Sequence, residues 1–173
     1  MKKIMFNDRF GLTDAVLQAR KTVTRRIIAP QPQGCLVPTP YGYSDGHYTK
    51  IVSQYQVGEI VAIAQSLQNI GLGDDGSAAW TNKMFVKAEM MPHKIEILDV
   101  RVERLQDITD EDCIKEGIMA DEDNYFFRYD PNGVYIFGTP REAFAELIDK
   151  VGKKGTWESN PYVFRYEFKL KEL

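Results

Sequence analysis

Apolar and polar positions in the first quarter of the chain change from a helical to an extended spacing. Apolar residues recur on one face over residues 10–20, which predicts a short amphipathic helix with Thr13 or Asp14 as its N-cap. β-Branched residues dominate residues 21–28, which predicts a strand that follows the helix directly. Residues 31–46 are rich in proline and glycine without periodicity, so we expect no regular element there.

Most of the remaining chain has strand patterns. Near-continuous apolar character predicts a central strand at residues 59–64 that is buried on both faces. Strand patterns also occur at residues 48–52, 84–90, 94–105 and 162–170. The alternation breaks at Leu98-Asp99, where we expect a β-bulge.

Capping residues predict two more helices. Thr109 and the acidic residues after it predict a helix over about 109–116, with Gly117 at its C′ position. A threonine followed by proline opens a second predicted helix over 139–151. Between these helices, the turn residues of 130–133 predict a hairpin.

Several strands and three short helices without regular β-α alternation predict an α+β fold with a curled or closed, mostly antiparallel sheet. The 173 residues, of which 43% are hydrophobic, suit one core, so we expect a single domain over 1–173. No apolar run approaches the roughly 20 residues that cross a bilayer, and no export signal is visible. With only two cysteines, far apart, these features lead us to expect a cytoplasmic protein that contacts no membrane.

Two common kinds of cofactor site find little support in the sequence. The carboxylates and histidines are not spaced as metal ligands, so we expect no metal. Residues 71–76 match G-x-G-x-x-G, but they follow no predicted strand and contain two aspartates that would face the phosphates. We interpret this stretch as a surface loop and expect no cofactor.

One short segment carries most of the candidate chemistry. The formal net charge of −3 gives no general attraction to nucleic acid, so any such contact requires a local basic cluster. Such a cluster lies within seven residues: Arg20, Lys21, Thr22, Thr24, Arg25 and Arg26. These side chains suit phosphate or polar base edges, and the alternative is a solvated edge strand. Strict strand alternation separates Lys21 from Thr24, so the two meet only if the helix–strand junction is bent.

Two further residues are candidates for a pocket. Glu116 falls in the last turn of its predicted helix, where carbonyl dipoles disfavour a negative charge. It is therefore a candidate proton carrier if it is partly buried, and the alternative is an exposed surface glutamate. Trp157 precedes the last strand and is either a pocket wall that stacks on a base or an anchor of the core.

Several motifs taken together resemble the ASCH family, most closely its phage and prophage members. They are Lys-Thr-x-Thr-Arg at 21–25, Gly58-Glu59, the stretch 100–118, the turn at 155–161 and the final strand at 162–168. The resemblance covers the chain apart from the loops at 31–57, 66–83 and 119–137. It implies a PUA-like β-barrel whose partner is RNA or a nucleoside-type small molecule.

One branch of that family is an amidohydrolase that removes the acetyl group from N4-acetylcytidine. The resemblance implies that Lys21, Thr24 and Glu116 match its catalytic residues. Thr24 would be the nucleophile, Lys21 would take its proton or hold the oxyanion, and Glu116 would carry a proton to the leaving amine. We expect the neighbouring arginines to lower the pKa of Lys21. Where phage members usually carry Arg-Glu-Thr-Trp, this chain has Ala-Gln-Ser-Leu, so Gln65 replaces a carboxylate at the expected pocket wall.

A binding module without turnover is the alternative function. In that case Arg20, Arg25 and Arg26 hold phosphate, Thr22 or Thr24 reads a base edge, and an aromatic side chain stacks on the base. A ribonuclease would use the same residues on a phosphodiester.

Overall fold

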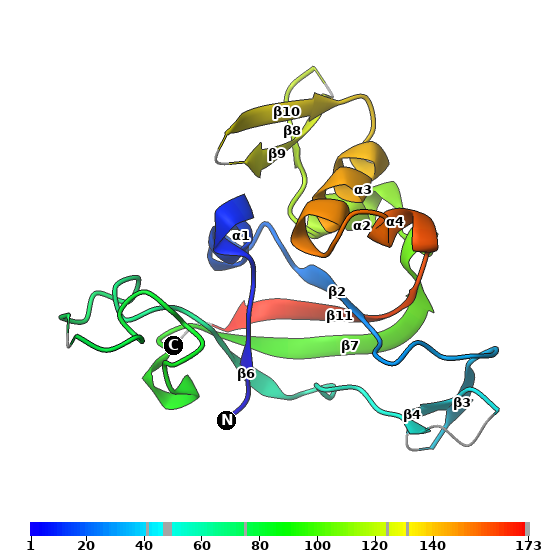
Figure 1. Ribbon diagram of the computed structural model, residues 1–173, viewed down its shortest axis with the longest axis horizontal. Helices are drawn as coiled ribbons and strands as arrows, with labels where there is room; N and C mark the ends of the chain where they lie inside the picture. The colour runs from blue at the N-terminus through cyan, green and yellow to red at the C-terminus, as the bar shows by residue number, and fades with distance from the viewer. Residues whose placement is uncertain (41, 47–49, 75, 124, 131, 172–173) are drawn as a thin grey trace.

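The computed structural model describes residues 1–171 apart from 41, 47–49, 75, 124 and 131, and only the backbone of 50 and 127–130. It shows an α+β fold built around a five-stranded sheet. All four α-helices lie on the same side of β2, β11 and β7, and the short strands form two small separate sheets (Figure 1).

The main sheet is mixed but mostly antiparallel, as the sequence predicts. Its order is β1 (Lys3–Ile4), β6 (Ile60–Ile63), β7 (Lys94–Arg104), β11 (Tyr162–Lys171) and β2 (Val23–Ile27). The β1–β6 pair is parallel and the other three pairs are antiparallel. As predicted, β6 lies inside the sheet and is buried along most of its length.

The long ladder between β7 and β11 contains the predicted bulge. Asp99 pairs with Glu167 and Ile97 pairs with Phe168, which leaves Leu98 as an extra residue on β7. Leu98 is exposed, whereas Ile97 and Phe168 lie in the core. The extra residue returns the apolar side chains to the core face after the break in alternation.

The sheet does not close into the expected barrel. β1 and β2 are its two edges, and no ladder joins them among the described residues. In place of a ladder, Arg26 Nη2 on β2 donates a hydrogen bond to the carbonyl of Met5, just after β1. A side chain thus crosses the gap that backbone pairing leaves open.

The helices are α1 (Leu12–Leu17), α2 (Asp110–Lys115), α3 (Pro140–Val151) and α4 (Thr156–Ser159), with 3₁₀ turns at Asp8–Phe10, Ala88–Met90 and Leu105–Asp107. The predicted cap of α1 is wrong: its N-cap is Gly11, with φ of 65°, and Thr13 and Asp14 lie inside the helix. The hydroxyl of Thr13 instead donates a hydrogen bond to Asp8 Oδ1. α2 and α3 begin at their predicted threonine caps.

The small sheets confirm the predicted hairpin and correct the prediction for residues 31–46. β8 (Met119–Ala120), β9 (Phe126–Asp130) and β10 (Gly133–Phe137) include the predicted hairpin, although Pro131 in its turn lies outside the described residues. β3 (Val37–Thr39), β4 (Gly42–Ser44) and β5 (Lys50–Ile51) form the other sheet, so 31–46 is not free of regular structure. The prediction for 48–52 holds for β5, and Tyr48 lies outside the described residues.

The strand predicted at 84–90 is absent, and a loop and a 3₁₀ turn occupy these residues. Val86 and Ala88 are nevertheless buried in a small apolar cluster with Ala62, Leu67 and Met91. Their apolar pattern therefore reflects packing without a β-ladder. Within the described part of the chain, no helix combines the length and apolar character needed to cross a membrane.

Gly117 connects the fold to the site and yields a first prediction. Its φ is +107°, and a Cβ atom there would lie 3.3 Å from Leu12 Cδ2 and 3.8 Å from Lys21 Cβ. We expect Gly117→Ala to lower the free energy of unfolding by about 1–2 kcal/mol from backbone strain, with an added loss from these contacts.

Gly155→Ala is the matched control. Gly155 has a φ of +87°, and a Cβ atom added there would have no described neighbour within 4 Å. Urea unfolding of both variants separates strain from packing. Equal losses in the two variants would show that the close contact with Leu12 adds nothing to the backbone strain.

Candidate functional site

The junction between α1 and β2 is bent, as a shared pocket for Lys21 and Thr24 requires. The backbone turns at Ala19, which has a positive φ of 56°. The amides of Arg20 and Lys21 then both donate to the carbonyl of Ala15, each at 2.9 Å. Lys21 consequently precedes the strand alternation, and its side chain points inward with 2% of its surface exposed.

Lys21 lies at the centre of a buried polar site. Its ammonium donates to the carbonyl of Val23 at 2.8 Å, to the carbonyl of Glu116 at 2.8 Å and to Glu116 Oε2 at 2.5 Å. Burial lowers the pKa of Lys21, the Glu116 carboxylate opposes this effect, and the charges of Arg26 and Arg25 add to it. The predicted direction is confirmed, but burial rather than the arginines is the main cause.

Glu116 is buried, not exposed on the surface. It is the C-cap of α2, and Gly117 follows it with the positive φ described above. Its carboxylate lies between two cations: Oε2 accepts from Lys21, and Oε1 accepts from Arg25 Nη1 at 3.2 Å. These cations balance the unfavourable helix-end dipole that acts on the carboxylate.

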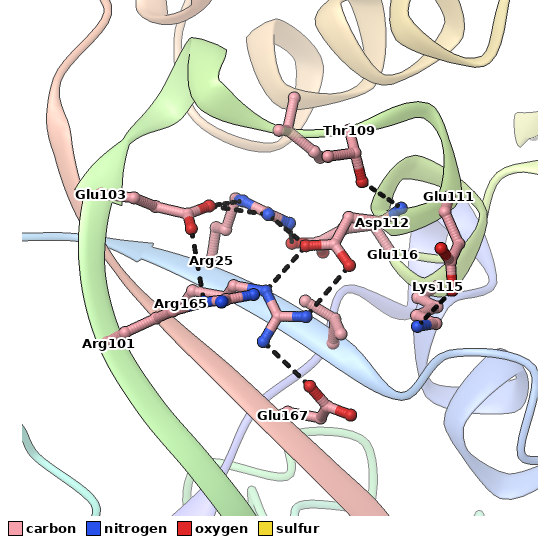
Figure 2. Close-up of polar contacts among 12 residues, drawn as sticks. Arg25, Arg101, Glu103, Thr109, Glu111, Asp112, Lys115, Glu116, Arg165 and Glu167 are labelled. Atoms are coloured by element: carbon pink, nitrogen blue, oxygen red, sulfur yellow. Dashed lines mark hydrogen bonds and ion pairs between the residues drawn. The ribbon is translucent and has the colours of Figure 1, made fainter.

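Arg25 connects Glu116 to a second layer of charged groups (Figure 2). Its guanidinium also contacts Asp112 Oδ2 at 2.6 Å and Glu103 Oε1 at 2.7 Å. Burial opposes the positive charge, but Glu116, Asp112 and Glu103 outweigh it, so the pKa of Arg25 is raised. The three carboxylates take up its donors, so Arg25 does not present the open phosphate-binding surface expected from the sequence.

Asp112 joins Arg25 to Arg165. Arg165 Nε donates to Asp112 Oδ2 at 2.7 Å and its Nη2 donates to Oδ1 at 3.0 Å, a bidentate contact visible in Figure 2. Burial disfavours the carboxylate charge, but hydrogen bonds from Arg165 and Arg25 hold the pKa of Asp112 well below its usual value. Arg165 is itself 2% exposed and also contacts Glu167 at 3.0 Å.

Lys21, Thr24, Arg25, Arg26 and Glu116 line one small cavity of about 60 Å³. Its remaining wall comes mainly from apolar side chains at the start of the chain and on α3. Thr24 is 4% exposed, and its hydroxyl has no hydrogen-bond partner within the part of the chain that the structure describes. A buried hydroxyl without a partner is uncommon and is consistent with a role toward a ligand.

The other predicted residues lie elsewhere. Arg20 is exposed, bonds to Gln18 and lines a separate cavity of about 290 Å³. Thr22 is partly buried, and its amide donates to the carbonyl of Lys115. Arg26 is partly buried over the ring of Phe6, 5.6 Å from the centroid. The basic segment therefore forms neither an open cationic surface nor a solvated edge, because only Arg20 extends into solvent.

Gln65 and Trp157 do not line the Lys21 cavity. Gln65 is buried, contacts His93 Nδ1 at 2.9 Å and lines a different cavity with Asp8, Thr13, Asp14, Leu17 and Asn69. Trp157 packs edge-on against Phe144 at 6.1 Å, with the guanidinium of Arg141 over its ring. Trp157 is therefore an anchor of the core, which is the alternative that its position before the last strand left open.

Sequence reasoning missed Asp112, Arg165 and Glu103. A signal for Arg165 exists, since it is a cation in the middle of the most strongly alternating strand of the chain. Asp112 was missed because the capping-box pattern at Thr109 already accounts for it. Its amide does donate to Thr109 Oγ1 at 3.1 Å, but its carboxylate accepts hydrogen bonds from Arg25 and Arg165. No local pattern indicates that partners so distant in sequence would meet.

The site has no arrangement that indicates a metal. In the described ranges, no group of three or more His, Cys, Asp or Glu side chains could hold a metal ion. Cys113 lies close to the site, but burial raises its pKa to about 12, so its thiol is not a nucleophile at neutral pH. No family model, curated protein or solved structure matches the chain.

The pairing of Asp112 yields a second prediction. Asp112→Asn leaves two buried guanidinium groups short of a charged acceptor, and we expect it to cost about 3–5 kcal/mol in urea unfolding at neutral pH. Because the folded pKa of Asp112 is depressed, its stabilisation is present above the ordinary aspartate value of 3.8 and is lost as the pH falls below it. The gap between wild type and variant should therefore shrink below about pH 4.

Asp110→Asn is the control, because Asp110 is exposed in the first turn of the same helix. It should change stability by no more than about 0.5 kcal/mol. A gap between wild type and Asp112→Asn that stays constant from neutral to acid pH would contradict the proposed charge pairing.

Proposed function

We propose that this chain is an amidohydrolase of the ASCH type, with a PUA-like fold, that removes the acyl group from an N4-acylated cytidine in the cytoplasm. The observation that supports this best is the convergence of Lys21, Thr24 and Glu116 on one buried cavity. The Lys-Thr-x-Thr-Arg motif at 21–25 supports the same residues through its resemblance to the family.

The hydrogen bonds of Lys21 favour one of its two possible roles. A neutral amine could donate only two of the three hydrogen bonds that Lys21 makes, so we assign the ammonium form. An ammonium has no lone pair for the proton of Thr24. In the proposal Lys21 therefore stabilises the oxyanion through its positive charge, since its three hydrogens are already donated, and Glu116 is the base.

The reaction begins when Thr24 Oγ1 attacks the amide carbonyl carbon and its proton passes to Glu116. The carbonyl oxygen becomes negatively charged near Lys21. Collapse of the tetrahedral intermediate breaks the C–N bond, Glu116 gives the proton to the departing amine, and an acyl ester remains on Thr24. Water then hydrolyses the ester, which releases the carboxylic acid and restores the hydroxyl.

The size of the cavity determines how such a substrate would bind. A volume of about 60 Å³ suits an acyl group, whereas pockets for whole small molecules have about 300–1,000 Å³. The cavity of about 290 Å³ that contains Arg20 shares two wall residues, Leu12 and Leu147, with the smaller one. In the proposal the nucleoside occupies the larger cavity, and these two side chains move to admit the acyl group.

Turnover of N4-acetylcytidine tests the proposal. Thr24→Val, Lys21→Ala and Glu116→Gln should each lower kcat/KM at least about 100-fold, because each removes a group that acts in the transition state. The losses should not add in double variants, since the three residues act as one unit.

Thr22→Val is the matched control, because Thr22 lies two residues away and does not line the cavity. It should retain wild-type turnover. A folded wild type that hydrolyses no acylated nucleoside, or a Thr24→Val variant as active as Thr22→Val, would contradict the proposal.

A non-catalytic RNA-binding or nucleotide-binding module, or a ribonuclease, is the second candidate. The observation that favours it is the exposed guanidinium of Arg20 at the larger cavity, where a phosphate could reach it. If this candidate is correct, Arg20→Gln should reduce the salt dependence of binding to a short single-stranded RNA by about one counterion. Unchanged salt dependence in a filter-binding assay would contradict this second candidate.

A further inference from the structure

Arg26 is a cation without a counter-ion. Within the part of the chain that the structure describes, no carboxylate lies within ion-pair distance of it, whereas Lys21, Arg25 and Arg165 each have at least one. The hydrogen bond of its guanidinium goes to a neutral backbone carbonyl, that of Met5. Burial lowers the pKa of Arg26, and the Glu116 carboxylate, which lies beyond ion-pair distance, offsets this only in part. Charged groups inside proteins are normally paired, so this position favours an additional anion.

A second feature points to the same place. Lys21 and Arg26 lie over the same aromatic ring, with Lys21 Nζ at 5.9 Å and Arg26 Cζ at 5.6 Å from the centroid of Phe6. Two like charges near one ring repel each other, and among the described residues only Lys21, of these two cations, has a carboxylate within ion-pair distance. An anion between them would remove this repulsion.

The cavity supplies the remaining donor. Lys21 and Arg26 both line it, and so does Thr24, whose buried hydroxyl has no partner among the described residues. The cavity thus offers a guanidinium and a hydroxyl to a ligand. Lys21 adds only its positive charge, because its three hydrogens are already donated. The single carboxylate of the cavity, Glu116, is already held by Lys21 and Arg25.

We propose that this cavity binds a small carboxylate anion, with Arg26 as its counter-ion and Thr24 as a hydrogen-bond donor. A guanidinium matches the planar carboxylate with two parallel hydrogen bonds. The volume of about 60 Å³ admits an acetate-sized ion and is small for a phosphate with a substituent.

This inference deepens the proposed function, because the acid that the proposed hydrolysis releases is such an anion. It thus rests in part on that function and predicts that acetate inhibits the reaction as a product. The unbalanced charge is a property of the free protein, so anion binding can be measured without any acylated substrate.

The experiment titrates the wild-type protein with sodium acetate at constant ionic strength and follows amide chemical shifts by NMR together with the melting temperature. Sodium chloride and sodium phosphate form the comparison arms. We expect saturable shifts at residues 21–26 and a rising melting temperature with acetate, and weaker effects with the other two anions. Arg26→Gln and Thr24→Val should each weaken acetate binding at least about tenfold.

Arg20→Gln is the matched control, because it removes the same charge from an exposed site six residues earlier in the chain. It should bind acetate as the wild type does. Thr24→Val keeps the shape of the side chain, so it tests the proposal even if Arg26→Gln fails to fold.

Equal behaviour of Arg20→Gln and Thr24→Val, or shifts that do not saturate, would overturn the anion site. Acetate binding without turnover of acylated cytidine would retain the site and reject the proposed hydrolysis. Turnover without acetate binding would retain the hydrolysis and reject the site.

Discussion

The buried ion pair between Lys21 and Glu116 is the interaction on which the rest of the structure depends. Removing two charges from water costs several kcal/mol each unless every donor and acceptor is satisfied. Lys21 meets this demand with three acceptors, and Glu116 meets it with a second cation, Arg25. Arg25 in turn donates a hydrogen bond to Asp112, which also accepts a hydrogen bond from Arg165. The chain of contacts joins β2, α2 and β11, so the network and the fold depend on each other.

The cavity at the end of this network lies beside the open edge of the sheet. A fully closed barrel would fill the space between β1 and β2 with backbone pairing, and no cavity would remain there. In the described part of the chain the Arg26 side chain crosses the gap by a hydrogen bond to the segment after β1, and residues of α3 complete the cavity wall. Apolar walls around a few polar groups lower the local dielectric, which strengthens any interaction of those groups with a ligand. The cavity thus lies where the sheet remains open.

Local sequence signals predicted much of the framework. The cap at Thr109, the pairing of β9 with β10 and the bulge at Leu98 depend on residues close in sequence, and the structure contains all three. The strand predicted at 84–90 failed because its apolar residues pack as a loop against a second cluster. In the site, the sequence identified Lys21, Thr24 and Glu116 but could not distinguish Arg25 from Arg26. Among the described residues, Arg25 pairs with three carboxylates and Arg26 with none. The partners of Arg25 lie nearly 80 residues or more away in the sequence.

The protonation of Lys21 tests the central claim most directly. The Nζ resonance of Lys21, assigned by its loss in Lys21→Arg, can be followed by ¹⁵N NMR from neutral to alkaline pH. The buried pair predicts an ammonium with slowly exchanging protons at neutral pH and a titration below the ordinary lysine value of 10.5, because burial outweighs the Glu116 carboxylate. In Glu116→Gln the midpoint should fall further. A Lys21 signal that exchanges rapidly and titrates with the exposed lysines, unchanged by Glu116→Gln, would contradict the account.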